Sequence, residues 1–166
     1  MIQEVDNISD KINLDFINTE SRKSKVRYQK PESLKELERI YFEMKKVRHP
    51  NNPAVIKTNF RDDTANELTR CIIAWLKING HFGARVNTMG TYNQKLGKYI
   101  RSGSRKGMAD ITGIISGRHV SIEVKKGRDK MRPEQIKVKA EVEASGGAYI
   151  VTTGFDDFLN QINKLK

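Results

Sequence analysis

Residues 107–125 constrain the fold of this chain more than any other segment. Two runs rich in β-branched residues flank the dipeptide Ser116-Gly117, and a dipeptide of this kind closes a tight β-hairpin. If the loop is symmetric about it, the numbers of paired residues sum to 233, which places Asp110 opposite Glu123. A slip of one residue would mix the two faces of the hairpin, so the pattern itself selects this register.

The register gives the hairpin one apolar and one polar face. The apolar face pairs Ala109 with Val124, Ile111 with Ile122, and Gly113 with Val120. The polar face pairs Asp110 with Glu123 and places Lys125 next to Glu123 along its strand. Like charges directly opposite each other on a sheet are destabilising. Two facing carboxylates beside a lysine therefore predict a site for a divalent cation, an arrangement typical of nucleases.

Positive charge is concentrated around this hairpin. The chain has a formal net charge of +11, and residues 81–139 contain 14 Lys or Arg against 4 Asp or Glu. Such a surface suits a polyanion, and a carboxylate pair at its centre would bring phosphates and a metal ion together. The predicted nucleic-acid contacts are Lys95, Lys98, Arg101, Arg105, Lys106, Lys126, Arg128, Lys130 and Arg132. A merely solvated charged surface is the alternative for each of them.

The length of 166 residues predicts one domain, residues 61–166, preceded by a helical or flexible extension over residues 1–60. No apolar run approaches the roughly 18 residues of a membrane span, and the N-terminus does not resemble a signal peptide. The single cysteine, Cys71, is expected to be a reduced core residue. A cytoplasmic location follows from that expectation, in the host cytoplasm if a phage encodes the chain.

Further helices and strands are expected around the hairpin. Ser33 with Glu36, and Thr64 with Glu67, have the spacing of a capping box and start helices that end near residues 48 and 79. A strand over residues 81–88 follows. The alternation of residues 136–143 fits a strand, but Lys–Glu pairs four residues apart and the following Gly146-Gly147 favour a helix. A strand over 148–152 and a helix over 155–164 complete the chain.

The order of these elements predicts an α/β fold, a mixed β-sheet flanked by helices. Residues 90–107 are expected to form a loop rich in glycine and basic residues, with Tyr92 and Tyr99 interleaved. This composition suits phosphate contacts and base stacking. A solvated loop without function is an equally weighted alternative.

Asp110, Glu123-Val124-Lys125 and Gln135 together resemble the motif of the PD-(D/E)XK nuclease superfamily, and the VRR-NUC branch most of all. That branch is similar to Holliday-junction resolvases and occurs in phage proteins and repair nucleases. The resemblance covers residues 64–164 and includes Pro133-Glu134-Gln135 at a helix start and Gly-Gly-Ala-Tyr-Ile-Val on the last strand. Ala109 stands where the motif name has proline, at a position that does no chemistry.

The resemblance implies a restriction-endonuclease-like sheet and a Mg²⁺-dependent DNA endonuclease that Mn²⁺ also supports. Its substrate would be branched or otherwise structured DNA. Resolvases of this type are usually dimers, because two strands must be cut, so a homodimer is the implied assembly. No membrane partner is expected.

The resemblance also assigns a role to each motif residue. Asp110 and Glu123 would bind the metal, joined by the backbone carbonyl of Val124. Lys125 would orient the attacking water or stabilise the developing negative charge, and a plain ion pair with Glu123 is compatible with that role. Gln135 would position the lysine, the water or a phosphate. Glu67 stands where relatives carry an acidic residue near the metal, but a capping box with Thr64 explains Glu67 equally well.

Two other function classes stay open at this point. A non-catalytic DNA-binding or virion-associated module would keep the fold, although facing carboxylates would repel phosphate in the absence of a cation. A metal-independent RNA endonuclease of related fold would require a Tyr/His/Lys group, and the three histidines of this chain are poorly placed for it.

Overall fold

The hairpin expected from residues 107–125 lies at the centre of a four-stranded sheet in the computed structural model, which describes residues 28–87, 90–100 and 103–165. Strands β4 (Ile111–Ile115) and β5 (Arg118–Val124) pair in the predicted register. Ser116 and Gly117 form the turn with φ angles of 50° and 79°. Positive values at both positions are what a two-residue hairpin loop with a type I′ turn requires.

Two more strands complete the sheet, which has the order β1-β4-β5-β6. β1 (Phe82–Arg85) pairs antiparallel with β4, and β6 (Ala148–Thr152) pairs parallel with β5. A parallel pair needs a crossover connection, and helix α3 (Pro133–Ala144) provides it. The helix expected over residues 136–143 and the strand expected over 148–152 are therefore confirmed, whereas β1 is shorter than the strand expected over 81–88.

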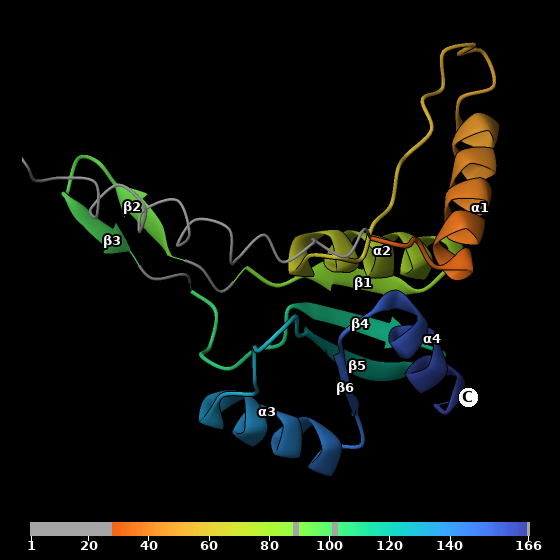
Figure 1. The fold of residues 1–166 in the computed structure, drawn as a ribbon. Helices are drawn as coiled ribbons and strands as arrows, with labels where there is room; N and C mark the ends of the chain where they lie inside the picture. The colour runs from red at the N-terminus through yellow and green to blue at the C-terminus, as the bar shows by residue number, and fades with distance from the viewer. Residues whose placement is uncertain (1–27, 88–89, 101–102, 166) are drawn as a thin grey trace, which may run out of the picture.

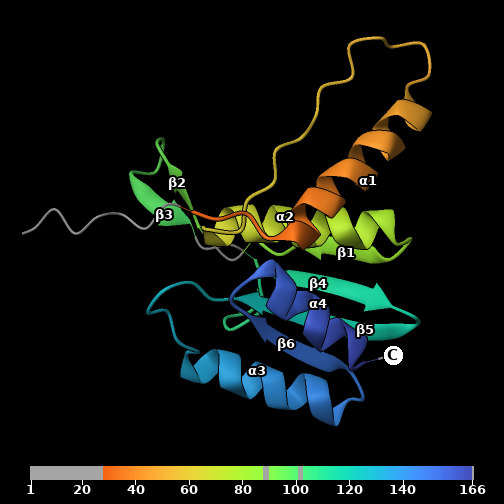
Figure 2. The ribbon, with the colours of Figure 1, turned by 45° about the vertical axis from the view of Figure 1, so that its right-hand side comes forward.

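Helices cover both faces of this sheet (Figures 1 and 2). On one face, α2 (Ala65–Ile78), α4 (Phe155–Asn163) and the outer helix α1 (Glu32–Arg48) enclose the larger core, which includes the fully buried Ile72, Ile122 and Phe158. On the other face, α3 packs over a smaller cluster around Val138 and Tyr149. The predicted fold class, a mixed sheet flanked by helices, is confirmed at this level.

The predicted position of Ala109 on the apolar face with Val124 is wrong. β4 begins only at Ile111, so the strand alternation that the register extends outward does not reach residue 109. Ala109 instead packs with Val138 and Tyr149 on the α3 side of the sheet, whereas Val124 belongs to the larger core.

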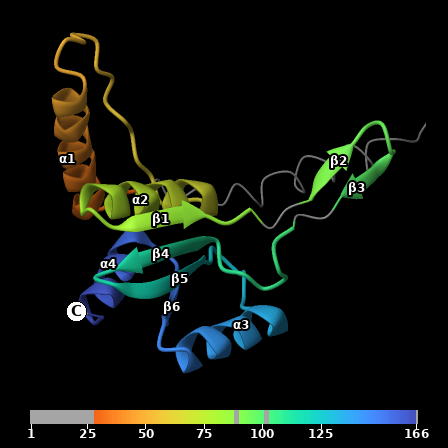
Figure 3. The same cartoon turned by 180° about the vertical axis from the view of Figure 1, so that it is seen from behind.

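The loop expected over residues 90–107 contains a second hairpin, so that prediction is also wrong in part. β2 (Thr91–Asn93) pairs antiparallel with β3 (Lys98–Ile100), with Tyr92 opposite Tyr99. The two rings are 5.2 Å apart between centroids, a distance at which aromatic pairs are attractive. The hairpin stands away from the four-stranded sheet (Figure 3) and exposes most of Tyr99.

Of the two expected N-terminal caps, the one on α2 is present and the one on α1 is absent. Thr64 caps α2 by accepting a hydrogen bond from the backbone N–H of Glu67 at 3.3 Å, which confirms the helix start and one half of the predicted capping box, while the Glu67 carboxylate bonds Arg70. The prediction for Ser33 is wrong, because α1 starts at Glu32 behind Pro31 and has no side-chain cap. The Ser33 hydroxyl instead donates to Asp156 at the start of α4, a contact between distant segments that local spacing does not encode.

The described part of residues 1–60 shares the main core, while the boundary at residue 60 and the character of residues 1–27 stay predictions. Leu34 and Leu37 of α1 are buried in the larger cluster. Asp62 accepts hydrogen bonds from the Tyr28 hydroxyl at 2.7 Å and from the backbone N–H of Phe155 at 3.0 Å. This buried carboxylate therefore connects the first described residues to α4.

Cys71 is a fully buried residue of α2, as predicted. Its thiol donates to the carbonyl oxygen of Arg61, and burial raises the pKa of the thiol to about 12. A thiol with so high a pKa has almost no thiolate at neutral pH, and the thiolate is the reactive form. Cys71 therefore contributes to core packing and is not a nucleophile. None of the described helices combines the length and the apolar composition that crossing a bilayer requires.

Candidate functional site

Glu123 is the most buried charged residue of the sheet. It lies near the end of β5, flanked by β4 and β6, and is only 2% exposed. Its Oε1 atom is bonded by neighbouring side chains, whereas Oε2 is buried and has no hydrogen-bond partner within the described protein. An ionised carboxylate with an unpartnered buried oxygen is costly, so this oxygen is open to a hydrogen-bond donor or a cation.

Lys125 follows β5 directly and lies on the same face as Glu123, as the alternation predicts. Its ammonium lies 2.9 Å from Glu123 Oε1, 3.1 Å from Gln135 Oε1 and 3.2 Å from Asp129 Oδ2. The side chain is 7% exposed. The charge of Lys125 is therefore held in place by three oxygen atoms in a largely desolvated position.

Asp110 lies at the mouth of the hairpin, just before β4. One of its carboxylate oxygens accepts a hydrogen bond from the backbone N–H of Val124 at 3.0 Å. This bond joins the two strand ends and places the Asp110 carboxylate beside the chain segment that contains Glu123 and Lys125. If the β4–β5 register is extended by one pair beyond Ile111–Ile122, Asp110 lies opposite Glu123.

The charges of these groups shift one another. Burial raises the pKa of Glu123 above its ordinary value, and the negative charge of Asp110 adds to that increase, while Lys125 acts in the opposite direction. Burial acts to lower the pKa of Lys125, but its bonds to Glu123 and Asp129 outweigh burial, so the pKa is raised and the ammonium stays charged. The site thus holds two acids near one fixed positive charge.

Gln135 joins helix α3 to the sheet at this site. Its Oε1 atom accepts from the backbone N–H of Arg132 at 2.9 Å and from Lys125, and its amide nitrogen donates to Glu123. The glutamine is the third residue of α3, so one side chain fixes the helix start, the lysine and the glutamate together. The structure therefore brings Gln135 into contact with the lysine that it is expected to position.

Two residues of this site are missing from the sequence-based set. Asp129 lies within the basic run 126–132, where a single acid reads as a solvated residue, yet it is one of the three partners of Lys125. Its spacing of four residues from Lys125 was the available signal. Tyr149 lies within a buried strand and has a buried hydroxyl without a hydrogen-bond partner in the described protein. In sequence, a tyrosine at this position looks like any other core residue.

Asp110 and the unpartnered Oε2 atom of Glu123 are the oxygen atoms that suit a hard divalent cation. Within residues 28–87, 90–100 and 103–165, no three His, Cys, Asp or Glu side chains gather as a metal site. Glu67 makes two 2.7 Å contacts to Arg70, and its place near a metal stays a prediction. A ligand role for the carbonyl of Val124 also stays a prediction.

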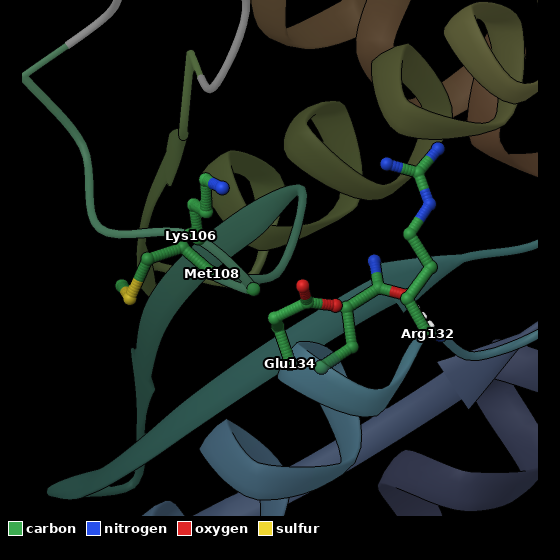
Figure 4. Close-up of a pocket in the computed structure, with 6 residues that line it drawn as sticks. Lys106, Met108, Arg132 and Glu134 are labelled. Carbon is green, nitrogen blue, oxygen red and sulfur yellow. Dashed lines mark hydrogen bonds between the residues drawn. The ribbon is translucent and has the colours of Figure 1, made fainter.

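A pocket of about 270 Å³ opens beside the site, at the start of α3 (Figure 4). It is lined by Lys106, Gly107, Met108, Arg132, Glu134 and Gln135. In Figure 4, Lys106 and Arg132 lie on opposite sides of Glu134. Two cations predicted to contact nucleic acid therefore flank one opening, and Gln135 links that opening to Lys125.

The other predicted nucleic-acid contacts are spread over the surface. Arg105 forms a bidentate ion pair with Glu141 at 2.6 and 2.8 Å, which offsets its charge. Lys126 donates to the carbonyl of Thr153. Arg128 and Lys130 are exposed after β5, Lys95 and Lys98 are exposed on the β2–β3 hairpin, and Arg101 lies outside the described residues.

Gly107 allows α3 to approach the strand that leads into the site. Its φ is +83°, and a Cβ atom there would lie 2.4 Å from the backbone oxygen of Glu134. Gly107→Ala is expected to lower the free energy of unfolding by about 1–3 kcal/mol, because the left-handed backbone and the contact with a backbone atom are both unfavourable. Urea unfolding measures this loss. Gly103→Ala, where no atom lies within 4 Å of the added carbon, is the matched control, and equal losses in both variants would contradict the argument.

No protein-family model matches this chain, and no curated protein matches it.

Proposed function

We propose that this chain is a metal-dependent endonuclease that hydrolyses phosphodiester bonds in DNA, with Mg²⁺ as its cation and Mn²⁺ as a substitute. The observation that carries the proposal is the unpartnered, buried Oε2 atom of Glu123, close to Asp110 and beside Lys125. Membership of the PD-(D/E)XK superfamily and its restriction-endonuclease-like sheet are part of the proposal.

The donor set fits a hard cation. Asp110 and Glu123 supply carboxylate oxygens, the ligands that Mg²⁺ takes in proteins. A bound Mg²⁺ would lower the pKa of a coordinated water and polarise the phosphate. In the metal-bound protein, the cation would offset the free-energy cost of burying Glu123 as an ion. This would account for a buried acid on an inner strand of the sheet.

Lys125 supplies the positive charge that the reaction needs. Phosphodiester hydrolysis places additional negative charge on the phosphate oxygens in the transition state, and a preorganised cation stabilises that charge. The ammonium of Lys125 is held by Glu123, Asp129 and Gln135, so it needs little reorganisation as the charge develops. Gln135 acts here by positioning the lysine.

The pocket flanked by Lys106 and Arg132 supports DNA as the substrate, because backbone phosphates are bound by such cations. A preference for branched DNA, cleavage by a homodimer and a cytoplasmic location follow from the resemblance and from composition alone. They belong to the proposal as its finer parts.

The test is cleavage by the purified chain of a labelled four-way junction and of the matched linear duplex. The proposal expects cleavage in Mg²⁺ or Mn²⁺ and none in EDTA, with restoration when the metal is added back. A preference for the junction would support the branched-DNA part. Binding of both DNAs without cleavage under every metal condition would overturn the catalytic proposal and favour a DNA-binding module.

A further inference from the structure

The hydroxyl of Tyr149 and the Oε2 atom of Glu123 are two buried side-chain atoms without a partner in the described residues. Tyrosine hydroxyls usually find a partner when they are buried, and Tyr149 is only 7% exposed. If these two atoms lie close together, a single bound group could form hydrogen bonds with both of them.

The sheet register places them on one face. On the parallel pair of β5 and β6, Ser121 is opposite Tyr149 and Glu123 is opposite Val151. Side chains two residues apart on a strand point to the same face, so Tyr149 lies on the face of Glu123, one pair further along. Tyr149 and Val151 both pack under α3, which closes this face from solvent.

The electrostatics of Tyr149 agree with this placement. Burial raises the pKa of its hydroxyl well above the ordinary value, and the charges of Glu123 and Asp110 raise it further. The hydroxyl therefore stays protonated at every working pH, and it is a hydrogen-bond donor close to both acids.

The two unpartnered atoms have complementary chemistry. The Tyr149 hydroxyl offers a proton, and the Glu123 carboxylate accepts one or binds a cation. They share a buried face without bonding each other. A water molecule between them would satisfy both, because its oxygen would accept from the tyrosine and one of its protons would be donated to the carboxylate.

We propose that Tyr149 is a positioning residue of the site, whose hydroxyl donates a hydrogen bond to a water molecule held by Oε2 of Glu123 or by the cation bound there. This inference rests on the proposed function and adds a group from β6 to a site otherwise built from residues 110–135. The hydroxyl would orient the water oxygen and steady the carboxylate, without entering the reaction itself.

Tyr149→Phe tests this inference, because it removes only the hydroxyl and keeps the ring in the α3 core. The apparent kcat for junction cleavage is expected to fall by about 10–100-fold with KM unchanged, and the affinity for Mn²⁺, measured by calorimetry without DNA, by a similar factor. The melting temperature in EDTA should fall by no more than about 2–4 °C, since the ring stays in the core and only the bond of the hydroxyl to a water molecule is lost.

Tyr41→Phe, a tyrosine packed against the larger core on the other face of the sheet, is the matched control and should leave cleavage and Mn²⁺ binding unchanged. A Mn²⁺ affinity that is unchanged in Tyr149→Phe, or Mn²⁺ binding that is absent in the wild type, would overturn the inference. That measurement needs no DNA, so it decides the inference even if the wild type does not cut.

The remaining outcomes separate the two proposals. Cleavage by the wild type that is unchanged in Tyr149→Phe overturns the inference and leaves the nuclease proposal standing. Failure of the wild type to cleave, with Mn²⁺ binding that is weakened in Tyr149→Phe, overturns the nuclease proposal and supports the inference.

Discussion

Asp110→Asn is expected to reduce the rate of DNA cleavage by at least about 10²–10³-fold, while fold and DNA binding stay intact. Asparagine keeps an oxygen that can accept the hydrogen bond from the backbone N–H of Val124, which Asp110 accepts at 3.0 Å. What it loses is the negative charge that a divalent cation requires. The variant therefore separates metal binding from the role of residue 110 in joining the strand ends.

Single-turnover cleavage of a four-way junction in Mg²⁺ measures this effect, and a gel-shift assay in Ca²⁺ measures DNA binding. Glu143→Gln is the control, because Glu143 is an exposed acid on α3, away from the strand ends that form the site. Equal cleavage rates in the wild type and Asp110→Asn would show that Asp110 has no role in the reaction. They would also contradict the proposed cation site. An equal loss in Glu143→Gln would show that net charge, rather than the site, controls the rate.

Lys125→Met is expected to lower the free energy of unfolding by about 3–5 kcal/mol at neutral pH, the cost of leaving one partner of a buried ion pair alone. Methionine fills a similar volume but leaves Glu123 as a buried carboxylate whose nearest compensating charge is gone. Cleavage should be lost in the same variant, because the cation that would stabilise the transition state is removed.

The loss of stability should depend on pH in a defined direction. A carboxyl whose pKa is raised in the folded state binds its proton more tightly there than in the unfolded chain. The pKa of Glu123 is already raised from 4.5, and removal of Lys125 raises it further. Destabilisation by Lys125→Met should therefore be small below pH 4.5 and grow as the pH rises through the window above it.

Urea unfolding at several pH values measures both effects, in a double-mutant cycle with Glu123→Gln. The double variant Lys125→Met/Glu123→Gln should regain most of the lost stability, since no buried charge is left unpaired. If the single variant is as stable as the wild type at neutral pH, or if the double variant regains nothing, then the ion pair does not control the stability of this face.

The register of the central hairpin was predictable because two local rules agree on it. The dipeptide Ser116-Gly117 takes positive φ at both positions, which fixes a two-residue loop, and the apolar alternation selects the same pairing. Glu123 and Lys125 were placed on one face by that register, and Pro133 marked the start of α3. In this segment local chemistry was sufficient, because sequence neighbours are also neighbours in space.

The errors have physical causes of two kinds. The β2–β3 hairpin has strands of three residues, too short for a periodic pattern to emerge, and its loop relies on the positive φ of Gly97. Ala109 was misplaced and Tyr149 was overlooked because tertiary contacts decide their environments, whereas Asp129 was overlooked although it pairs with Lys125 at a local spacing of four residues. Tyr149 approaches Glu123 only after α3 has crossed over and β6 has paired in parallel, which no local spacing encodes.

The order in which contacts become possible during folding follows from the position of the site along the chain. Asp110, Glu123, Lys125 and Gln135 lie in one hairpin and the helix that follows it, so they can meet through short loop closures. The opposite face needs contacts between residues as far apart as Asp62 and Phe155, 93 positions along the chain. The groups of the candidate site can therefore be assembled before residues from the two ends of the domain come into contact, and changes in α1 can weaken the domain without altering the geometry of the site.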